Sequence, residues 1–179
     1  PGERVLVIGC GTSAFVAESF ALLREQAGFG ETDAAYASEP RPWRDYDAVI
    51  GITRSGTTTE VVQALSALPE GVRRVVVTGV ADSPCAELSD ELLLLDFADE
   101  SSVVQTRFAT TALMVLRAHL GEDVTGAIAD SARAVAEPLP AGVAERTQFT
   151  FLGSGWTVGL AHGLGFLLGL VPGGGPITA

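Results

Sequence analysis

Short apolar segments alternate along the chain with longer segments that have helical periodicity. The short segments run five or six residues, the length of buried strands, and several are rich in β-branched residues; they are residues 4–8, 36–40, 48–52, 74–79 and 91–96. Most of them are apolar at consecutive positions, as expected for strands buried on both faces. The pattern therefore predicts an α/β fold, a three-layer αβα sandwich with a five-stranded parallel sheet.

The helical segments place an internal boundary late in the chain. After the first strand a helix is predicted to end near Gly28, and later helices are predicted over residues 108–120 and 124–137. A proline-rich stretch, residues 138–142, reads as a linker. The pattern of apolar strand, Gly-x-Gly and helix then restarts at residue 149, as at residues 7–13. This echo predicts a first domain over 1–140 and the start of a second copy over 141–179.

The junction between the third predicted strand and its helix is unusually rich in hydroxyl groups. Five of them surround Gly56: Thr53, Ser55, Thr57, Thr58 and Thr59. Helix N-termini leave N–H groups without partners and carry partial positive charge, which suits an anion such as phosphate. The alternative is ordinary helix capping, with Glu60 completing a capping box, but capping needs one or two such residues rather than five.

Another glycine-containing loop lies at residues 9–14. It follows the first strand and is called here the first glycine loop. It matches the first two glycines of the Gly-x-Gly-x-x-Gly dinucleotide fingerprint, with Ala14 at the third, and Glu39 lies near the end of the second predicted strand, where an acid would meet ribose. That fingerprint is weak alone, and it does not explain the hydroxyl groups around Gly56. In parallel α/β sheets, ligands bind at the carboxyl ends of the strands, where both loops are predicted.

Charge and cysteine content exclude some classes of partner. The formal net charge is −11 with 11 Lys and Arg residues, which disfavours nucleic acid and anionic membranes. The two cysteines, Cys10 and Cys85, have no disulfide-framework or metal-site spacing, so a reduced, cytoplasmic setting is expected. No signal-peptide pattern and no run long enough for a transmembrane helix is seen in the sequence.

Taken as an ordered series, the loops resemble the sugar isomerase (SIS) family, which includes the isomerase half of glucosamine-6-phosphate synthase and isomerases of amino-sugar phosphates. The resemblance covers about 150 residues. Its motifs are Gly9-Cys10-Gly11-Thr12-Ser13, Ala37-Ser38-Glu39, Thr53-Arg54-Ser55-Gly56-Thr57-Thr58, the segment 100–111 with Thr106-Arg107 in place of Thr-Lys, and Phe151-Leu152-Gly153-Ser154-Gly155.

The resemblance implies a phosphosugar ligand, an amino-hexose or hexose 6-phosphate, and an aldose/ketose isomerase or deaminase activity. It also implies a homodimer, and neither a cofactor nor a metal is expected. By position, phosphate would be held by the loop around Gly56, and the sugar by the first loop and the segment before the long helix. The implied binding residues are Gly11, Thr12, Ser13, Thr53, Ser55, Gly56, Thr57, Thr58, Val103, Val104, Gln105 and Arg107.

The acid and base residues of the family are not matched. Isomerisation moves a proton between neighbouring carbons and needs a positioned base. The family's helix positions for these groups fall on Gly163, Leu167 and Leu170, and Gly174 stands where the family has histidine. The remaining candidates are Glu100, which also reads as a solvated loop acid, and His162, which also reads as a packed polar residue.

Three functions therefore stay open. The first is a phosphosugar isomerase or deaminase, and the second is a non-catalytic phosphosugar-sensing or regulatory module, which the unmatched bases favour. The third is an NAD-binding oxidoreductase fragment, which NAD binding without sugar-phosphate binding would select.

Overall fold

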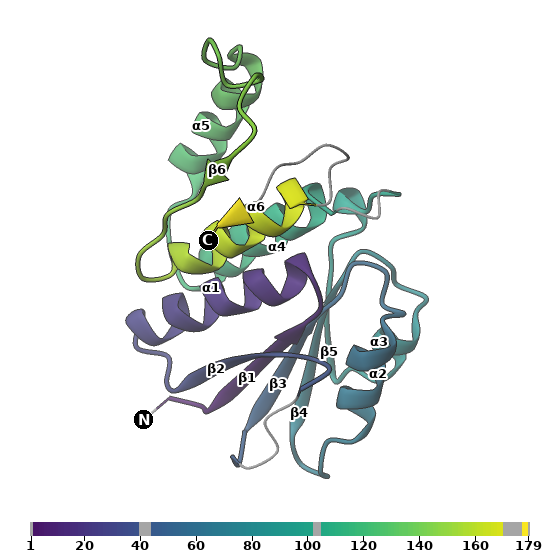
Figure 1. Cartoon of the computed structure of the whole chain (residues 1–179). Coiled ribbons are helices and arrows are strands. Elements are labelled where there is room, and N and C mark those ends of the chain that lie inside the picture. Colours follow the sequence, from purple (N-terminus) through teal and green to yellow (C-terminus); the bar gives the residue numbers. More distant parts are fainter. Residues whose placement is uncertain (1, 40–43, 102–104, 170–176, 179) are drawn as a thin grey trace.

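A five-stranded parallel sheet forms the centre of the computed structural model, which describes residues 2–39, 44–101, 105–169 and 177–178 (Figure 1). The strand order is β2-β1-β3-β4-β5 and every pairing is parallel. This confirms the predicted α/β sheet. The strands are β1 (Val5–Gly9), β2 (Thr32–Tyr36), β3 (Ala48–Ile52), β4 (Arg73–Thr78) and β5 (Glu91–Leu94).

The second strand lies earlier in the chain than its sequence predicted. Thr32 pairs with Val5 and Tyr36 with Gly9, whereas residues 37–39 form a turn, so the prediction of a strand over 36–40 was wrong in its position. β2 is an edge strand with only Thr32 buried. An edge strand needs fewer apolar residues than a central one, and the apolar pattern is correspondingly weak there.

Helices cover both faces of the sheet. α1 (Thr12–Gln26) and α4 (Arg107–His119) lie on one face, and α2 (Thr59–Ser66) and α3 (Pro84–Glu87) on the other (Figure 1). Alternate residues of β1 supply the two cores: Val5 and Val7 pack with the α1 and α4 side chains, and Leu6 and Ile8 with those of α2.

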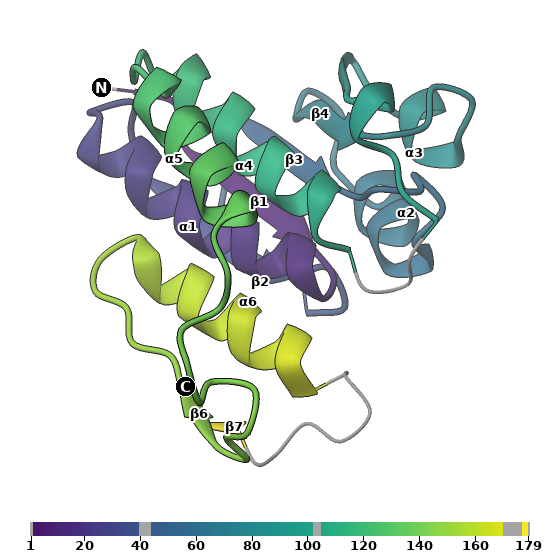
Figure 2. The same ribbon diagram turned by 90° about the horizontal axis from the view of Figure 1, so that it is seen from above.

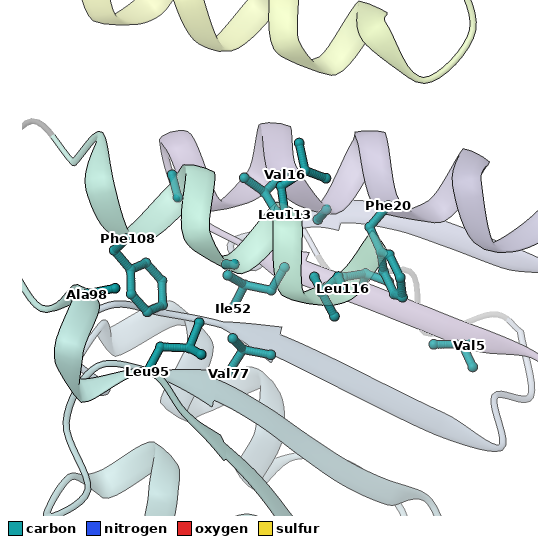
Figure 3. Close-up of a cluster of buried hydrophobic side chains, with 14 of the residues drawn as sticks. Val5, Val16, Phe20, Ile52, Val77, Leu95, Ala98, Phe108, Leu113 and Leu116 are labelled. Atoms are coloured by element: carbon teal, nitrogen blue, oxygen red, sulfur yellow. The ribbon is translucent and has the colours of Figure 1, made fainter. Parts of the chain in front are cut away.

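The larger core lies between the sheet and the pair formed by α1 and α4 (Figure 3). Phe20 and Phe108 are its largest fully buried side chains, and they pack with Ile52 and Val77 from the sheet. Burying each such side chain contributes roughly 1.5–3 kcal/mol. A 3₁₀ turn, η1 (Asp96–Ala98), brings Leu95 and Ala98 into the same core and leads towards α4.

The segment after residue 140 adds an outer layer. α6 (Thr157–Gly169) packs on the outer side of α1, and β6 (Phe149–Thr150) pairs with β7 (Ile177–Thr178) in a separate two-stranded parallel sheet (Figures 1 and 2).

α5 (Thr125–Ala136) projects from the body and buries none of its residues (Figure 1). The assignment of 141–179 to a second unit stays a prediction. Among the described residues, no helix has the length and apolar character to cross a membrane.

Candidate functional site

The predicted loops meet at one edge of the sheet, where the parallel strands end. The chain runs from β1 outwards to β2 and then returns past β1 to β3, so the strand order reverses between β1 and β3. Gly9 at the end of β1 lies in register with Ile52 at the end of β3. Loops that diverge at such a switch point leave a crevice, which is where open α/β sheets bind ligands.

Residues 53–58, called here the hydroxyl loop, leave β3 at this point and are held by their own side chains. The Thr53 side chain is 2% exposed, and its Oγ1 lies 3.0 Å from Oγ1 of Thr58. Ser55 Oγ accepts hydrogen bonds from the Thr57 backbone N–H at 3.2 Å and from Thr57 Oγ1 at 2.9 Å. Thr53 therefore supports the loop from beneath, and Ser55, Thr57 and Thr58 form its outer side.

The N-terminus of α2 is open above this loop. Within the described residues Thr58, the N-cap, makes no side-chain bond to the first turn, because its hydroxyl faces Thr53. The Val62 N–H is bonded to the Thr58 carbonyl, as expected one turn into the helix. The preceding amides belong to the turn that ordinarily binds a cap or an anion. The arrangement offers backbone N–H groups and nearby hydroxyls to one negatively charged group.

Gly56 gives the loop its shape, and the loop between β4 and α3 supports it. Gly56 has φ +65°, and a Cβ there would lie 2.0 Å from Ser83 Oγ. Ser83 is 2% exposed and donates to the Val80 carbonyl at 3.0 Å. Two residues further along, the N–H of Cys85 in α3 donates to the Gly56 carbonyl at 3.0 Å. Sequence reasoning missed Ser83: a serine before Pro84 signals only a helix cap.

The first glycine loop presents mainly backbone to the crevice. Gly11 has φ +54°, and a Cβ on Gly9 would lie 2.8 Å from the Ser13 Cβ, so the turn is tight. Thr12 and Ser13 are both buried. Thr12 lines a cavity of about 230 Å³ between α1, α4 and α6, together with Gln105. The structure thus brings these two predicted site residues together, in a cavity that is lined by no residue of the hydroxyl loop.

Glu100 caps a helix in the structure. Its Oε1 accepts from the backbone N–H groups of Thr106 at 3.0 Å and Phe108 at 2.9 Å, at the start of α4. Arg107 donates through Nη2 to the backbone carbonyl of Asp99. Both residues therefore have local structural partners. Val103 and Val104 lie outside the described residues.

Arg54, in the hydroxyl loop, is a further residue that sequence reasoning passed over. Its Nη1 lies 3.1 Å from Oδ1 of Asp99 and also donates to the Glu100 carbonyl. Its own carbonyl accepts from the Gly79 N–H at 2.9 Å. These partners lie 25 to 46 residues further along the chain, so no local pattern signals them.

His162 lies in a different hollow from the hydroxyl loop. Its Nδ1 is 3.0 Å from Oε2 of Glu18, and its ring packs against Phe15 with centroids 6.2 Å apart. The hollow has a volume of about 340 Å³ and is also lined by Tyr36 and Glu39, but by no residue of the hydroxyl loop. The structure thus separates the two predicted base candidates from each other and gives each a partner.

The sequence of this chain matches a known protein family and several known proteins. The model of the SIS domain family matches residues 2–120. A glutamine–fructose-6-phosphate aminotransferase (isomerizing) of Aquifex aeolicus is 37% identical over 124 residues, 65% of this chain and 20% of that one. An uncharacterized protein of Archaeoglobus fulgidus is 29% identical over 128 residues, 66% of this chain and 69% of that one.

Solved structures show the same fold at lower identity. A tagatose-6-phosphate ketose/aldose isomerase from Escherichia coli has a TM-score of 0.78 at 21% identity, over 97% of this chain and 55% of that one. A glucosamine-6-phosphate deaminase from Thermotoga maritima has a TM-score of 0.76 at 22% identity, over 92% and 56%. This chain thus spans little more than half of those proteins. Its sheet, its loops and the match over residues 2–120 together show that the chain belongs to the SIS domain family.

Proposed function

We propose that this chain binds a phosphorylated sugar, an amino-hexose or hexose 6-phosphate, with the phosphate at the hydroxyl loop. The observation that carries the proposal is the open N-terminus of α2 above a set of hydroxyl groups, at the β1/β3 switch point. An acidic chain can bind phosphate this way because the donors are local amides and hydroxyls, so no strong positive field is needed.

Each group in the site has a distinct task in this proposal. The α2 amides and the hydroxyls of Ser55, Thr57 and Thr58 bind the phosphate oxygens, and Thr53 fixes Thr58. Gly11, with Thr12 and Ser13, forms the opposite wall, and Gln105 approaches the sugar from the start of α4. The names of related proteins, which include sugar-phosphate isomerases and a deaminase, support this ligand class.

Turnover of the bound sugar is the finer part of the proposal. An isomerase or deaminase needs a free base beside the C1–C2 region of the sugar. The carboxylate of Glu100 is bonded to two backbone amides, and His162 is paired with Glu18 in the separate hollow. These contacts favour the second candidate, a module that binds a phosphosugar without converting it, unless a base comes from outside the described residues.

Calorimetric titration tests the binding site. We expect fructose 6-phosphate or glucosamine 6-phosphate to bind, and Ser55→Ala to weaken that binding at least tenfold, about 1.4 kcal/mol. Ser66→Ala is the matched control, because the Ser66 hydroxyl donates to the Val62 carbonyl near the other end of α2, away from the hydroxyl loop. Sugar-phosphate binding that is unchanged by Ser55→Ala would contradict the proposal. Binding of NAD without binding of either sugar phosphate would also contradict it.

Solvent deuterium exchange separates the two candidate functions. In heavy water an isomerase would incorporate deuterium at C2 of an aldose 6-phosphate or at C1 of a ketose 6-phosphate, because the proton passes through the base. A binding module would leave the sugar unlabelled at saturating ligand. Nuclear magnetic resonance of the recovered sugar reads out either result.

A further inference from the structure

A hollow of about 510 Å³ opens at the amino ends of the strands, at the opposite edge of the sheet from the hydroxyl loop. The first residues of β1, β3, β4 and β5 line it; they are Val5, Ala48, Arg73 and Glu91. Val5 and Phe20, both labelled in Figure 3, mark where it borders the larger core. This hollow, called here the amino-end hollow, shares no lining residue with the hydroxyl loop.

The floor of the amino-end hollow is apolar. Ile50, Val75 and Leu93 come from three neighbouring strands, line the hollow and are only partly buried. Val115 and Leu116 of α4 form one of its sides. The helices of the described chain therefore leave apolar sheet surface within reach of a ligand, and burial of such surface favours binding of an apolar group.

A buried arginine lies in the wall of this hollow. The Arg24 side chain is 9% exposed, and its Nη1 donates to two uncharged oxygens, the Glu3 carbonyl at 3.1 Å and Thr32 Oγ1 at 2.9 Å. The Glu3 carboxylate is more distant, because its Oε2 lies 3.9 Å from Arg24 Nη2 and accepts from Arg73 Nη2 at 2.8 Å. Burial lowers the pKa of the Arg24 guanidinium, and Glu3 offsets this only in part. A buried charge is costly unless it is paired, so an anionic ligand would stabilise Arg24.

The other charged groups of the hollow limit the charge of such a ligand. Its two carboxylates, Glu3 and Glu91, both pair with Arg73, at 2.8 Å and 3.4 Å. Arg73 Nε is buried and has no hydrogen-bond partner among the described residues, and His119 adds a third basic side chain. The basic groups favour one negative charge, whereas the two nearby carboxylates would repel a second one.

We propose that the amino-end hollow binds a small monocarboxylate with an apolar body, with the carboxylate at Arg24 and the apolar body on the partly exposed sheet face. Arginine binds carboxylates well because its N–H groups match the two carboxylate oxygens. Mostly apolar walls with a few placed polar groups are typical of small-molecule sites. This site is separate from the proposed sugar-phosphate site, which lies at the other edge of the sheet.

A purely structural role is the alternative for Arg24. Its bonds to Thr32 Oγ1 and to the Glu3 carbonyl tie α1 to the edge strand β2 and to the segment before β1. The two roles predict different results. Loss of a structural contact disturbs the hollow and weakens charged and uncharged ligands alike, whereas loss of a ligand contact weakens only the ligand that has a carboxylate.

The test uses backbone amide shifts in titrations with octanoate, with 1-octanol as its uncharged counterpart and with acetate, which lacks the apolar body. We expect octanoate to shift the amides of residues 48–50, 73–75 and 91–93, and to bind at least tenfold more tightly than 1-octanol or acetate. Arg24→Gln is expected to weaken octanoate binding at least tenfold and to leave 1-octanol binding within twofold. Arg133→Gln is the matched control, because it removes the same charge from the exposed helix α5, where Arg133 pairs with Asp130 and Glu137.

A second variant tests the same hollow without touching the bonds of Arg24. Val115→Glu places a negative charge in the wall formed by α4, and it should weaken octanoate binding at least tenfold by repulsion. Thermal unfolding monitors the fold of each variant, and Val115→Glu carries the comparison if Arg24→Gln does not fold. Octanoate shifts that are absent or lie elsewhere would overturn the proposal, and so would octanoate and 1-octanol binding equally well. Equal loss of both ligands in Arg24→Gln would assign a structural role and also overturn it.

Discussion

Single residues fix the shape of the hydroxyl loop through contacts that allow little substitution. Gly56 adopts a left-handed conformation and lies directly against Ser83. The loop must make this turn for Ser55 and Thr57 to bond to each other and for α2 to begin at Thr59. The left-handed conformation and the close approach are two separate demands, and each can be measured.

Replacement of Gly56 by alanine is expected to destabilise the fold for both reasons. The positive φ costs about 1–2 kcal/mol for a residue with a Cβ, and crowding against Ser83 adds about 1–3 kcal/mol. Gly71→Ala is the matched control, because Gly71 has φ +91° with nothing within 4 Å of an added Cβ. Urea unfolding measures both free energies, and an equal loss in the two variants would show that the contact with Ser83 is unimportant.

The two thiols are expected to react slowly and at different rates. Burial raises the pKa of the Cys10 thiol and Glu60 raises it further, and burial raises the pKa of Cys85 to about 11. A raised pKa lowers the fraction of thiolate at neutral pH, and the thiolate is the nucleophile. Iodoacetamide at pH 7.5 should label Cys10 slowly, faster as the pH rises, and Cys85 only after unfolding. Mass spectrometry that found Cys85 labelled in the native chain would contradict this account.

At the scale of elements, the central strands could be predicted and the edge strand could not. β1 is buried at every position and β3 at nearly every one, so their apolar runs are unambiguous. β2 has one buried residue, and its prediction slipped to the following turn. The hydroxyl loop was visible because its residues are contiguous. The roles of Arg54 and Ser83 were not, because they depend on residues brought close only by the fold.

The contact between α1 and α6 depends on one glycine. A Cβ on Gly159 would lie 2.5 Å from the Phe15 carbonyl oxygen and 2.4 Å from Ser19 Oγ, whereas one on Gly163 would meet Phe15 at 3.5 Å, an ordinary contact. Gly159→Ala is therefore expected to loosen α6 from α1, and Gly163→Ala to be neutral or stabilising by up to about 1 kcal/mol, since alanine favours helix.

Hydrogen exchange detected by mass spectrometry distinguishes these two variants. Faster exchange in α6 is expected for Gly159→Ala alone, with the sheet unaffected. Equal exchange in both variants would mean that the close approach of the two helices does not hold α6 in place.

At the scale of the whole molecule, apolar side chains remain exposed away from the sheet. α5 buries none of its residues, and Ile128 and Val135 are among the exposed apolar side chains of the chain. A helix of 12 residues is marginal alone in water. The homodimer implied by the family resemblance stays a prediction, and association through such surfaces would be consistent with it.

Sedimentation velocity tests the dimer directly. At micromolar concentration we expect a species with twice the chain mass of 18.5 kDa, and its share should fall on dilution. Ile128→Glu combined with Val135→Glu should lower that share if α5 takes part in the interface. A single species of 18.5 kDa at every concentration would contradict the prediction.

The proposed phosphate site lies where α2 begins, at the β1/β3 switch point. The most direct test is a two-dimensional ¹⁵N–¹H spectrum recorded during titration with glucosamine 6-phosphate. We expect the largest shifts at the amides of residues 55–61, with smaller shifts at Gly11 and Ser13. Shifts confined to the hollow around His162, or none at saturating ligand, would contradict it.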